Sequence, residues 1–376
     1  MTQRAAVRPI PLSFPWLDER EEELVLEVLR SGRLSLGPTI DRFEERFAEA
    51  AGAPYAAAVS SGTAGLHLLC HLADLRDGDE VITSPYSFVA TANCFVYEGA
   101  RPVFADIDPA TLNLDPAAVE ALITPRTRAV VAVDIFGYPS ELEELQAICT
   151  RHGLTLIDDA CEALGAEYAG RPLAAHGQDA VFAFYPNKQM TTGEGGVVTT
   201  HSEETWRLLK SLRNQGRADD GGWLEHARLG FNYRLDDVRA AIGIGQLEKL
   251  DAILAGRRAV AARYGALLAD VDGVELPCPD DDRHVRSWFV YVVTLPRGVD
   301  REAVIEQLDE AGVSTARYLP CIHLQRYMRE RYGFREGLCP VAEDLSQRTL
   351  ALPFHTRLEL GDQERVVEAL TRAVAG

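Results

Sequence analysis

Short apolar runs alternate with amphipathic segments between residues 55 and 200 of this 376-residue chain. Seven runs have the length of buried strands: Ala56–Val59, Glu80–Thr83, Pro102–Ala105, Ala129–Val133, Leu154–Ile157, Ala180–Phe184 and Gly196–Thr199. Between them lie stretches with helical spacing of apolar residues, such as Thr63–Ala73, Pro116–Leu122 and Glu141–His152. This alternation is typical of a mostly parallel sheet with crossover helices on both faces. The pattern predicts a large α/β domain built on a seven-stranded sheet.

Helical patterns also lie before and after this region. Two amphipathic stretches, Leu17–Arg30 and Thr39–Ala51, come before the first strand, and each is closed by a glycine. A long helical pattern runs from about Asp236 to Leu268. It is followed by the predicted strand Ser287–Leu295, the helix Arg301–Ala311 and a last helix, Gly361–Ala375. We expect an N-terminal arm and large domain over residues 1–250 and a smaller α/β domain over residues 251–376.

The chain is acidic, with a formal net charge of −19, and its acidic residues are spread along the sequence. Such a field repels nucleic acid and anionic membrane surfaces, so we expect neither as a partner. The seven cysteines form no C-x-x-C pair and read as reduced thiols. The first residues lack the apolar core of a signal peptide, and the sequence holds no apolar stretch of membrane-spanning length. These features predict a cytoplasmic protein.

A lysine stands out in the segment from Asp179 to Gly196, because the chain contains only three lysines, Lys188, Lys210 and Lys249. A strand leads to a turn, Lys188 follows the turn, and a Gly-Glu-Gly-Gly stretch returns the backbone towards it. A half-buried apolar site would favour the neutral amine that forms a Schiff base. Judged by residue type alone, an exposed lysine in a turn is the more common case.

Two further segments have candidate chemistry. Asp158 and Asp159 end a buried strand, where open α/β sheets place their ligands. One of the two carboxylates can also cap a following helix, and for Asp158 we favour that structural role. Ser60-Ser61-Gly62-Thr63 leads a strand into a helix and directs free N–H groups and hydroxyls to one spot, which suits a phosphate.

Together these segments resemble the DegT-like sugar aminotransferases, a branch of the fold-type-I pyridoxal-phosphate enzymes. The resemblance covers almost the whole chain from Ser31-Gly32-Arg33-Leu34 onwards. It implies pyridoxal 5′-phosphate as cofactor and Lys188 as the residue that carries it as a Schiff base. The other cofactor-binding residues that it implies are Asp159 at the pyridine nitrogen, Glu162 close to the ring, Gly62 and Thr63 at the phosphate, and Phe88 stacked on the ring.

The same resemblance implies a homodimer with shared active sites and a set of substrate contacts. Asn232, in Gly230-Phe-Asn-Tyr-Arg234, matches the family position that reaches the phosphate of the neighbouring subunit. Tyr86, Arg213, Asn214 and His323 resemble positions that line the substrate cleft. Without the family, the segment around Asn232 reads only as a polar loop before a helix.

One position departs from the family pattern. Many members place a serine four or five residues before the lysine to bind the cofactor phosphate, and this chain has Ala183 there. Losing one hydrogen bond costs about 1 kcal/mol, which is too little to abolish binding, and Tyr185 or Asn187 can compensate. Relatives in which histidine replaces the lysine are dehydratases, so Lys188 favours amino transfer.

Two other groups of potential metal ligands are explained more simply by structural roles. His67 and His71 would share a helix face, as zinc ligands do, but no third ligand is evident, and packing under the phosphate turn is favoured. The run Asp280-Asp281-Asp282 lacks the ligand spacing of a calcium loop. We expect no metal site.

The sequence therefore predicts an aminotransferase that moves an amino group from an amino acid, L-glutamate by resemblance, to a keto-sugar nucleotide. Surface polysaccharide or a glycosylated metabolite would be ordinary destinations of the amino sugar. Three alternatives stay open: a cyclitol acceptor, a related enzyme such as a sugar dehydratase or cysteine desulfurase, and a non-catalytic regulatory protein on the same scaffold. The identity of the sugar, the nucleotide and the carbon that receives nitrogen is not contained in the motifs.

Overall fold

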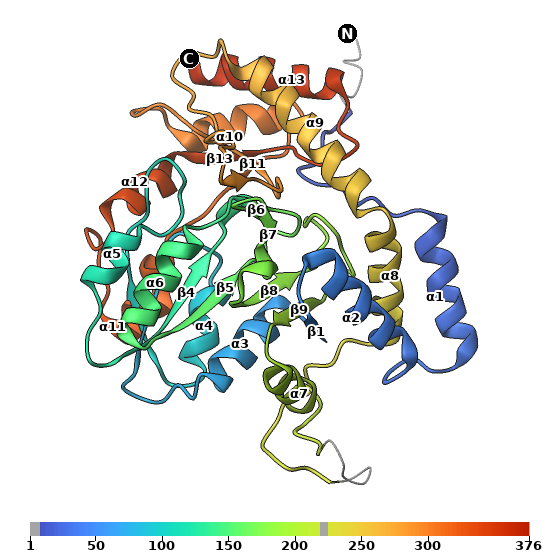
Figure 1. Ribbon diagram of the computed structural model, residues 1–376. Coiled ribbons are helices and arrows are strands. Elements are labelled where there is room, and N and C mark those ends of the chain that lie inside the picture. Colours follow the sequence, from blue (N-terminus) through green and yellow to red (C-terminus); the bar gives the residue numbers. More distant parts are fainter. Residues whose placement is uncertain (1–7, 219–224, 376) are drawn as a thin grey trace.

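A computed structural model describes residues 8–218 and 225–375, and its centre is a seven-stranded sheet (Figure 1). The strand order is β1-β9-β8-β5-β4-β2-β3. The strands are β1 (Tyr55–Val59), β2 (Glu80–Thr83), β3 (Arg101–Phe104), β4 (Thr127–Val133), β5 (Thr155–Asp159), β8 (Asp179–Ala183) and β9 (Gly196–Thr200). Strand β9 is antiparallel to β1 and β8, whereas β8, β5, β4, β2 and β3 pair in parallel. The predicted seven-stranded, mostly parallel sheet is confirmed.

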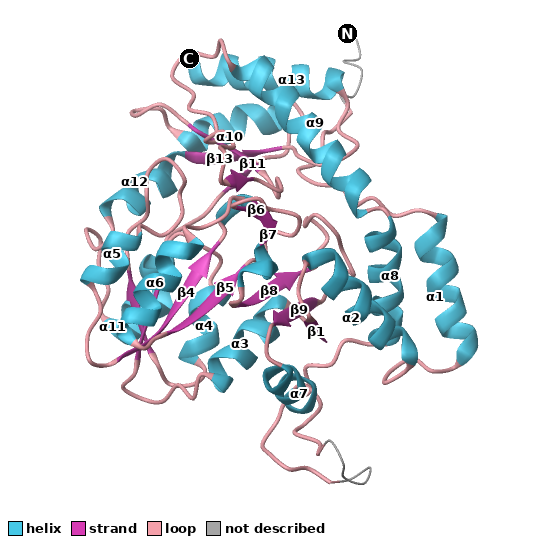
Figure 2. Cartoon of the chain, in the orientation of Figure 1, coloured by secondary structure: helices cyan, strands magenta, loops and turns pink. Residues whose placement is uncertain are grey.

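Helices cover both faces of this sheet, because alternate strand residues point to opposite sides (Figure 2). Val131 and Val133 pack in one hydrophobic cluster, whereas Val130 and Ala132 pack in another. The first cluster includes residues of α3 (Gly62–Leu72), α4 (Ala90–Val96) and α7 (Glu203–Leu212). The second includes residues of α5 (Pro116–Ala121) and α6 (Leu142–His152). Because both faces of these parallel strands are buried, their sequences are continuous apolar runs.

The N-terminal helices α1 (Glu19–Ser31) and α2 (Pro38–Ala51) pack beside α8 (Asp237–Glu248) at the β1 end of the sheet. The long helical pattern expected from Asp236 to Leu268 is two helices, α8 and α9 (Leu250–Leu268). The break is at Lys249, whose φ and ψ of −121° and 14° leave the helical region. Its ammonium forms ion pairs with Asp18 and Glu21 of the α1 start, each at 2.7 Å.

Helix α9 leads to a smaller, separate core at the top of Figure 1. Its first turns pack with the large-sheet residues, and its later residues, such as Val260 and Tyr264, pack in the second core. That core surrounds the sheet β11-β13-β12 (Tyr291–Thr294, Thr349–Leu352 and Ala316–Arg317) with α10 (Arg301–Glu310) and α13 (Leu360–Ala375). The N-terminal Ile10 joins this core and donates its N–H to the Gly312 carbonyl at 2.8 Å.

Two short helices of the C-terminal part were not expected: α11 (Arg326–Tyr332) and α12 (Pro340–Arg348). Residues of both, such as Met328 and Leu345, pack in the cluster of the large sheet. A third sheet joins β10 (His284–Val285), β6 (Glu167–Tyr168) and β7 (Arg171–Pro172). Short 3₁₀ segments lie at Ile135–Gly137, Leu173–His176 and Ile322–Leu324.

The chain division expected at residue 250 stays a prediction. Among the described helices, none has the length and apolarity needed to cross a membrane.

Candidate active site

A cavity of about 540 Å³ lies where the parallel strands β5 and β8 end. This is the edge at which open α/β sheets place their ligands. Six of the residues predicted from the sequence line it: Gly62, Thr63, Phe88, Asp159, Glu162 and Lys188. The topology thus brings together segments that are far apart along the chain.

Lys188 follows the turn after β8, where its N–H donates to the Tyr185 carbonyl at 2.9 Å. Its side chain is 13% exposed, so it is not an ordinary surface lysine. The Nζ atom lies 3.3 Å from Oε1 of Glu162 and 3.8 Å from the ring centroid of Phe289. The other Glu162 oxygen accepts the N–H of Phe136 at 2.9 Å. The amine is therefore held between a fixed carboxylate and an aromatic face at the cavity wall.

Asp159 is the last residue of β5 and is 5% exposed. Its Oδ2 accepts a hydrogen bond from the Thr91 hydroxyl at 2.6 Å, and its Oδ1 accepts the N–H of Cys161 at 3.3 Å. The Thr91 hydroxyl lies 2.8 Å from that of Ser87. These contacts fix the direction of the carboxylate at the cavity wall.

Asp158 faces away from this cavity, as strand alternation requires. It is fully buried, and its Oδ2 accepts from Nε2 of Gln178 at 2.9 Å. Burial raises the pKa of Asp158 to about 6. The helix-capping role expected for Asp158 is wrong, because residues 160–165 form turns and not a helix.

The predicted phosphate turn forms the N-terminus of α3. Ser61 is the N-cap, and its hydroxyl accepts the N–H of Ala64 at 3.1 Å. A Cβ atom at Gly62 would lie 2.8 Å from both Ala183 Cβ and Cys161 Sγ, so only glycine fits there. The absence of that Cβ leaves backbone N–H groups of a helix N-terminus open to the cavity, which favours an anion.

These groups fit pyridoxal phosphate. An anion cradle at Gly62 and Thr63, an acid at Asp159 and an amine at Lys188 line one cavity, whose volume suits a small organic ligand. Ala183, the position that departs from the expected pattern, lines it too. The exposed rings of Phe88 and Tyr185 lie at the same cavity.

Tyr86 and His323 are buried and do not line this cavity, and the substrate contacts expected of them stay a prediction. Tyr86 is fully buried, and its hydroxyl donates to the Tyr318 carbonyl at 2.5 Å and lies 2.8 Å from the Thr349 hydroxyl. His323 is fully buried as well, and its Nε2 is 2.9 Å from Oε1 of Glu343. Both side chains join the C-terminal part of the chain to the large sheet.

Arg213, Asn214 and Asn232 also lie outside this cavity within a single chain. Arg213 and Asn214 line a second hollow of about 170 Å³ beside α2. Arg213 is 7% exposed, and its guanidinium donates to Glu44 and to the Ala58 carbonyl. Asn214 pairs with Asn232 in an isolated antiparallel bridge, and Asn232 is exposed.

His67 and His71 pack on the segment that carries Asn232. The ring of His67 lies 2.9 Å from the Tyr233 hydroxyl through Nδ1 and 2.8 Å from Oε1 of Glu98 through Nε2. His71 contacts the same Glu98 oxygen at 3.1 Å. The packing role favoured for this pair agrees with these contacts.

Sequence reasoning missed several residues that line the cavity or hold its groups. Ser87 precedes helix α4 and Thr91 lies in its first turn, and the sequence pattern alone marks neither residue as functional. Phe289 and Tyr318 come from segments more than 90 residues beyond Lys188 and reach the cavity only through the tertiary fold. A single sequence contains no signal for such contacts.

A cavity with this lysine, acid and anion cradle at the edge of a seven-stranded α/β sheet defines a fold-type-I pyridoxal-phosphate enzyme. The chain belongs to the DegT/DnrJ/EryC1/StrS aminotransferase family, whose model matches residues 15–371. Pyridoxal phosphate is the cofactor of this family. The predicted family, fold class, cofactor and enzyme class are confirmed.

Several relatives cover nearly the whole chain. The spore coat polysaccharide biosynthesis protein SpsC of Bacillus subtilis is 36% identical over 381 aligned residues, which cover 98% of this chain and 97% of SpsC. The aminotransferase TlmJ from Streptoalloteichus hindustanus is 34% identical with a TM-score of 0.91, covering 97% of this chain and 99% of TlmJ. DesV of S. venezuelae, solved in complex with a ketimine intermediate, is 33% identical with a TM-score of 0.89, covering 96% and 98%.

Proposed function

We propose that this protein is a sugar aminotransferase that moves the amino group of L-glutamate to a keto-sugar carried on a nucleoside diphosphate. The observation that carries the proposal is the joint placement of Lys188, Asp159 and the Gly62 turn around one cavity. The similarity to SpsC, a polysaccharide biosynthesis protein, supports an amino sugar as the product.

Pyridoxal phosphate, when bound, supplies a ring that accepts electrons from the carbon next to the reacting nitrogen. Lys188 would hold the cofactor covalently, and its Nζ atom would carry the proton between donor and acceptor positions in both half-reactions. Asp159, oriented by Thr91, would keep the ring nitrogen protonated. Glu162, 3.3 Å from Nζ, is placed to exchange a proton with the lysine.

The cavity walls assist this chemistry. Leu66, Val133 and Phe289 contribute apolar surface beside the polar groups. An apolar wall limits water around Lys188 and strengthens the electrostatic interactions of Asp159. The helix N-terminus at Gly62 would hold the phosphate at a fixed distance from the lysine.

The direct test supplies the protein with pyridoxal phosphate, ¹⁵N-labelled glutamate and a panel of keto-sugar nucleotides. We expect labelled amino-sugar nucleotide by mass spectrometry and an equal amount of 2-oxoglutarate. Lys188→Ala should keep the fold and lose turnover, whereas Lys210→Ala, on helix α7 outside the lining of this cavity, is the matched control and should keep turnover.

Three results would contradict the proposal. Full turnover by Lys188→Ala would remove the lysine from the mechanism. Conversion of the sugar without transfer of ¹⁵N would indicate a dehydratase. Labelled product from a keto-cyclitol, with none from the sugar nucleotides, would replace the acceptor class.

We also propose a homodimer in which Asn232 of each subunit completes the cavity of the other. Asn232 is exposed and lies outside the cavity of its own chain, and the nearby Leu229 is 82% exposed. Mixing inactive Lys188→Ala and Asn232→Ala chains after unfolding should restore about a quarter of wild-type turnover, because half of the random dimers regain one intact site. Recovery would be absent if Asn232 served its own chain.

The proposed location is the cytoplasm. All seven cysteines lie within the described residues and are free thiols, including the adjacent Cys70 and Cys94, whose sulfurs are 3.4 Å apart. Reduced thiols are the usual state in that compartment. Alkylation of intact cells before lysis, with cysteine peptides read by mass spectrometry, would test it: disulfide between Cys70 and Cys94 would contradict it.

A further inference from the structure

Arg257 is a buried cation whose function the cofactor motifs do not explain. It lies in the second turn of α9 and is 4% exposed. Burial lowers the pKa of its guanidinium to about 10. Within residues 8–218 and 225–375, no carboxylate forms an ion pair with it. A buried guanidinium without a carboxylate is costly unless other acceptors satisfy it.

Backbone carbonyls of two separate segments supply acceptors for its two terminal nitrogens. One terminal nitrogen, Nη1, donates to the carbonyls of Phe289 at 3.0 Å and Trp288 at 3.2 Å. The other, Nη2, donates to the carbonyls of Lys188 at 2.8 Å and Asn187 at 3.4 Å. The rigid planar fork of arginine can hold two such segments at a constant separation, which a lysine ammonium cannot do.

The two segments carry side chains that face each other in the cavity. The Nζ atom of Lys188 lies 3.8 Å from the ring centroid of Phe289. A lysine side chain has four rotatable bonds, so its direction depends on its backbone anchor and on the surfaces around it. Arg257 contacts the backbone of both members of this pair and therefore controls their separation.

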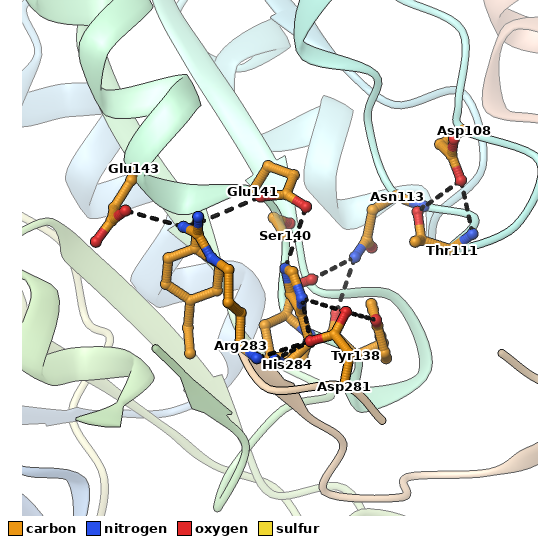
Figure 3. A network of polar contacts seen from close by, with 12 residues as sticks. Asp108, Thr111, Asn113, Tyr138, Ser140, Glu141, Glu143, Asp281, Arg283 and His284 are labelled. Atoms are coloured by element: carbon orange, nitrogen blue, oxygen red, sulfur yellow. Dashed lines mark hydrogen bonds and ion pairs between the residues drawn. The ribbon is translucent and has the colours of Figure 1, made fainter. Parts of the chain in front are cut away.

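The other end of the Phe289 segment is anchored independently (Figure 3). The ring of His284 stacks on Tyr138 with centroids 5.2 Å apart, and its Nδ1 lies 2.9 Å from Oδ1 of Asp281. Strand β10, which contains His284, pairs with β6. Loss of Arg257 would thus release the Phe289 end while this network still holds the preceding residues.

We propose that Arg257 is a positioning residue for Lys188: its guanidinium ties the backbones of Lys188 and Phe289 together and so directs the lysine amine into the cavity. The inference rests on the proposed function, in which Lys188 holds the cofactor. Arg257 itself acts through the backbone and does not contact the reacting atoms.

The test compares Arg257→Met and Arg257→Lys with wild type and with Arg263→Met. Arg263 is the matched control, because it lies on the same helix and donates to a backbone carbonyl, that of Leu358 at 2.9 Å, without contact to Lys188. The experiment uses cofactor-free protein and measures the rate at which each lysine is acetylated, in competition with the others, at a series of pH values. Peptide mass spectrometry quantifies the acetylated lysines. Since the chain has three lysines, Lys210 and Lys249 are internal references for Lys188.

Both Arg257 variants should raise the pH-independent acetylation rate of Lys188, relative to the two references, by about fivefold. Arg263→Met should leave the ratio unchanged. A second readout adds pyridoxal phosphate and follows the visible band against pH: the titration midpoint should shift in the Arg257 variants and stay in place in the control.

A folded Arg257 variant with wild-type acetylation and a wild-type titration midpoint would overturn the proposal and leave Arg257 as a tie between helix and loop. If circular dichroism shows that Arg257→Met fails to fold, Arg257→Lys decides, since it keeps the charge but not the fork. Failure of the proposed function would look different, because wild type itself would then form no visible band, whereas the acetylation ratio would still report on Arg257.

Discussion

Ala183 offers the sharpest quantitative test of the anion cradle. Ala183 lines the cavity at the end of β8, and a Cβ atom added at Gly62 would lie only 2.8 Å from the Cβ atom of Ala183. Ala183→Ser would therefore place a hydroxyl beside the helix N-terminus that we expect to hold the phosphate. The substitution adds one donor and removes nothing from the core.

The expected gain follows from the charge of the acceptor. A hydrogen bond to a charged group contributes about 1.5 kcal/mol, which lowers the Kd for pyridoxal phosphate roughly tenfold. Ordering a serine hydroxyl costs little, because serine has one rotatable bond beyond Cβ. We expect a fivefold to tenfold decrease as an order of magnitude, about what the cited bond energy allows.

The assay titrates cofactor-free protein with pyridoxal phosphate and follows the intrinsic fluorescence to obtain Kd. Pyridoxal, which lacks the phosphate, is the ligand control, and Ala183→Gly is the protein control. Tighter binding of pyridoxal phosphate alone would support the cradle. An unchanged Kd in a folded Ala183→Ser protein, or an equal gain for pyridoxal, would refute the placement of the phosphate at Gly62.

Two further substitutions test the paired carboxylates of β5. Asp159→Asn removes the negative charge that Thr91 orients, so kcat should fall about a hundredfold or more while the protein stays folded. The rate of 2-oxoglutarate release measures kcat. A loss below about threefold would contradict the role of Asp159. Asp158 has a folded pKa of about 6, above its usual 3.8, so the folded state holds the proton more tightly. The free energy of unfolding of the wild type should therefore fall by at most about 3 kcal/mol as the pH rises from about 4 to above 6. Urea unfolding of Asp158→Asn over the same pH range should show a weaker fall. An equal fall in the variant would contradict the raised pKa of Asp158.

The extent to which the sequence predicts the fold depends on how local the determining pattern is. All seven strands of the large sheet were located within one or two residues, because each is a buried apolar run between turns. The break at Lys249 was missed, since ion pairs to Asp18 and Glu21, more than 200 residues away, form there. Local periodicity contains no record of such a contact.

The site shows the same division. Lys188, Asp159 and the Gly62 turn follow strands of one sheet, so their meeting at its edge could be expected. The sequence did not indicate that the Tyr86 ring is buried, because its hydroxyl contacts the Tyr318 carbonyl and Thr349, which lie more than 200 residues further along the chain. Arg257 carried no motif, and its contacts to Lys188 and Phe289 exist only after α9 packs against the cavity.

The central claim is that Lys188 holds pyridoxal phosphate, and borohydride trapping tests it most directly. The purified protein is supplied with the cofactor, its visible spectrum is recorded before and after borohydride, and the reduced pyridoxyl adduct is located by peptide mass. We predict a violet-region band that borohydride bleaches, with the adduct on Lys188. No band after addition of cofactor, or an adduct on Lys210 or Lys249, would contradict the account.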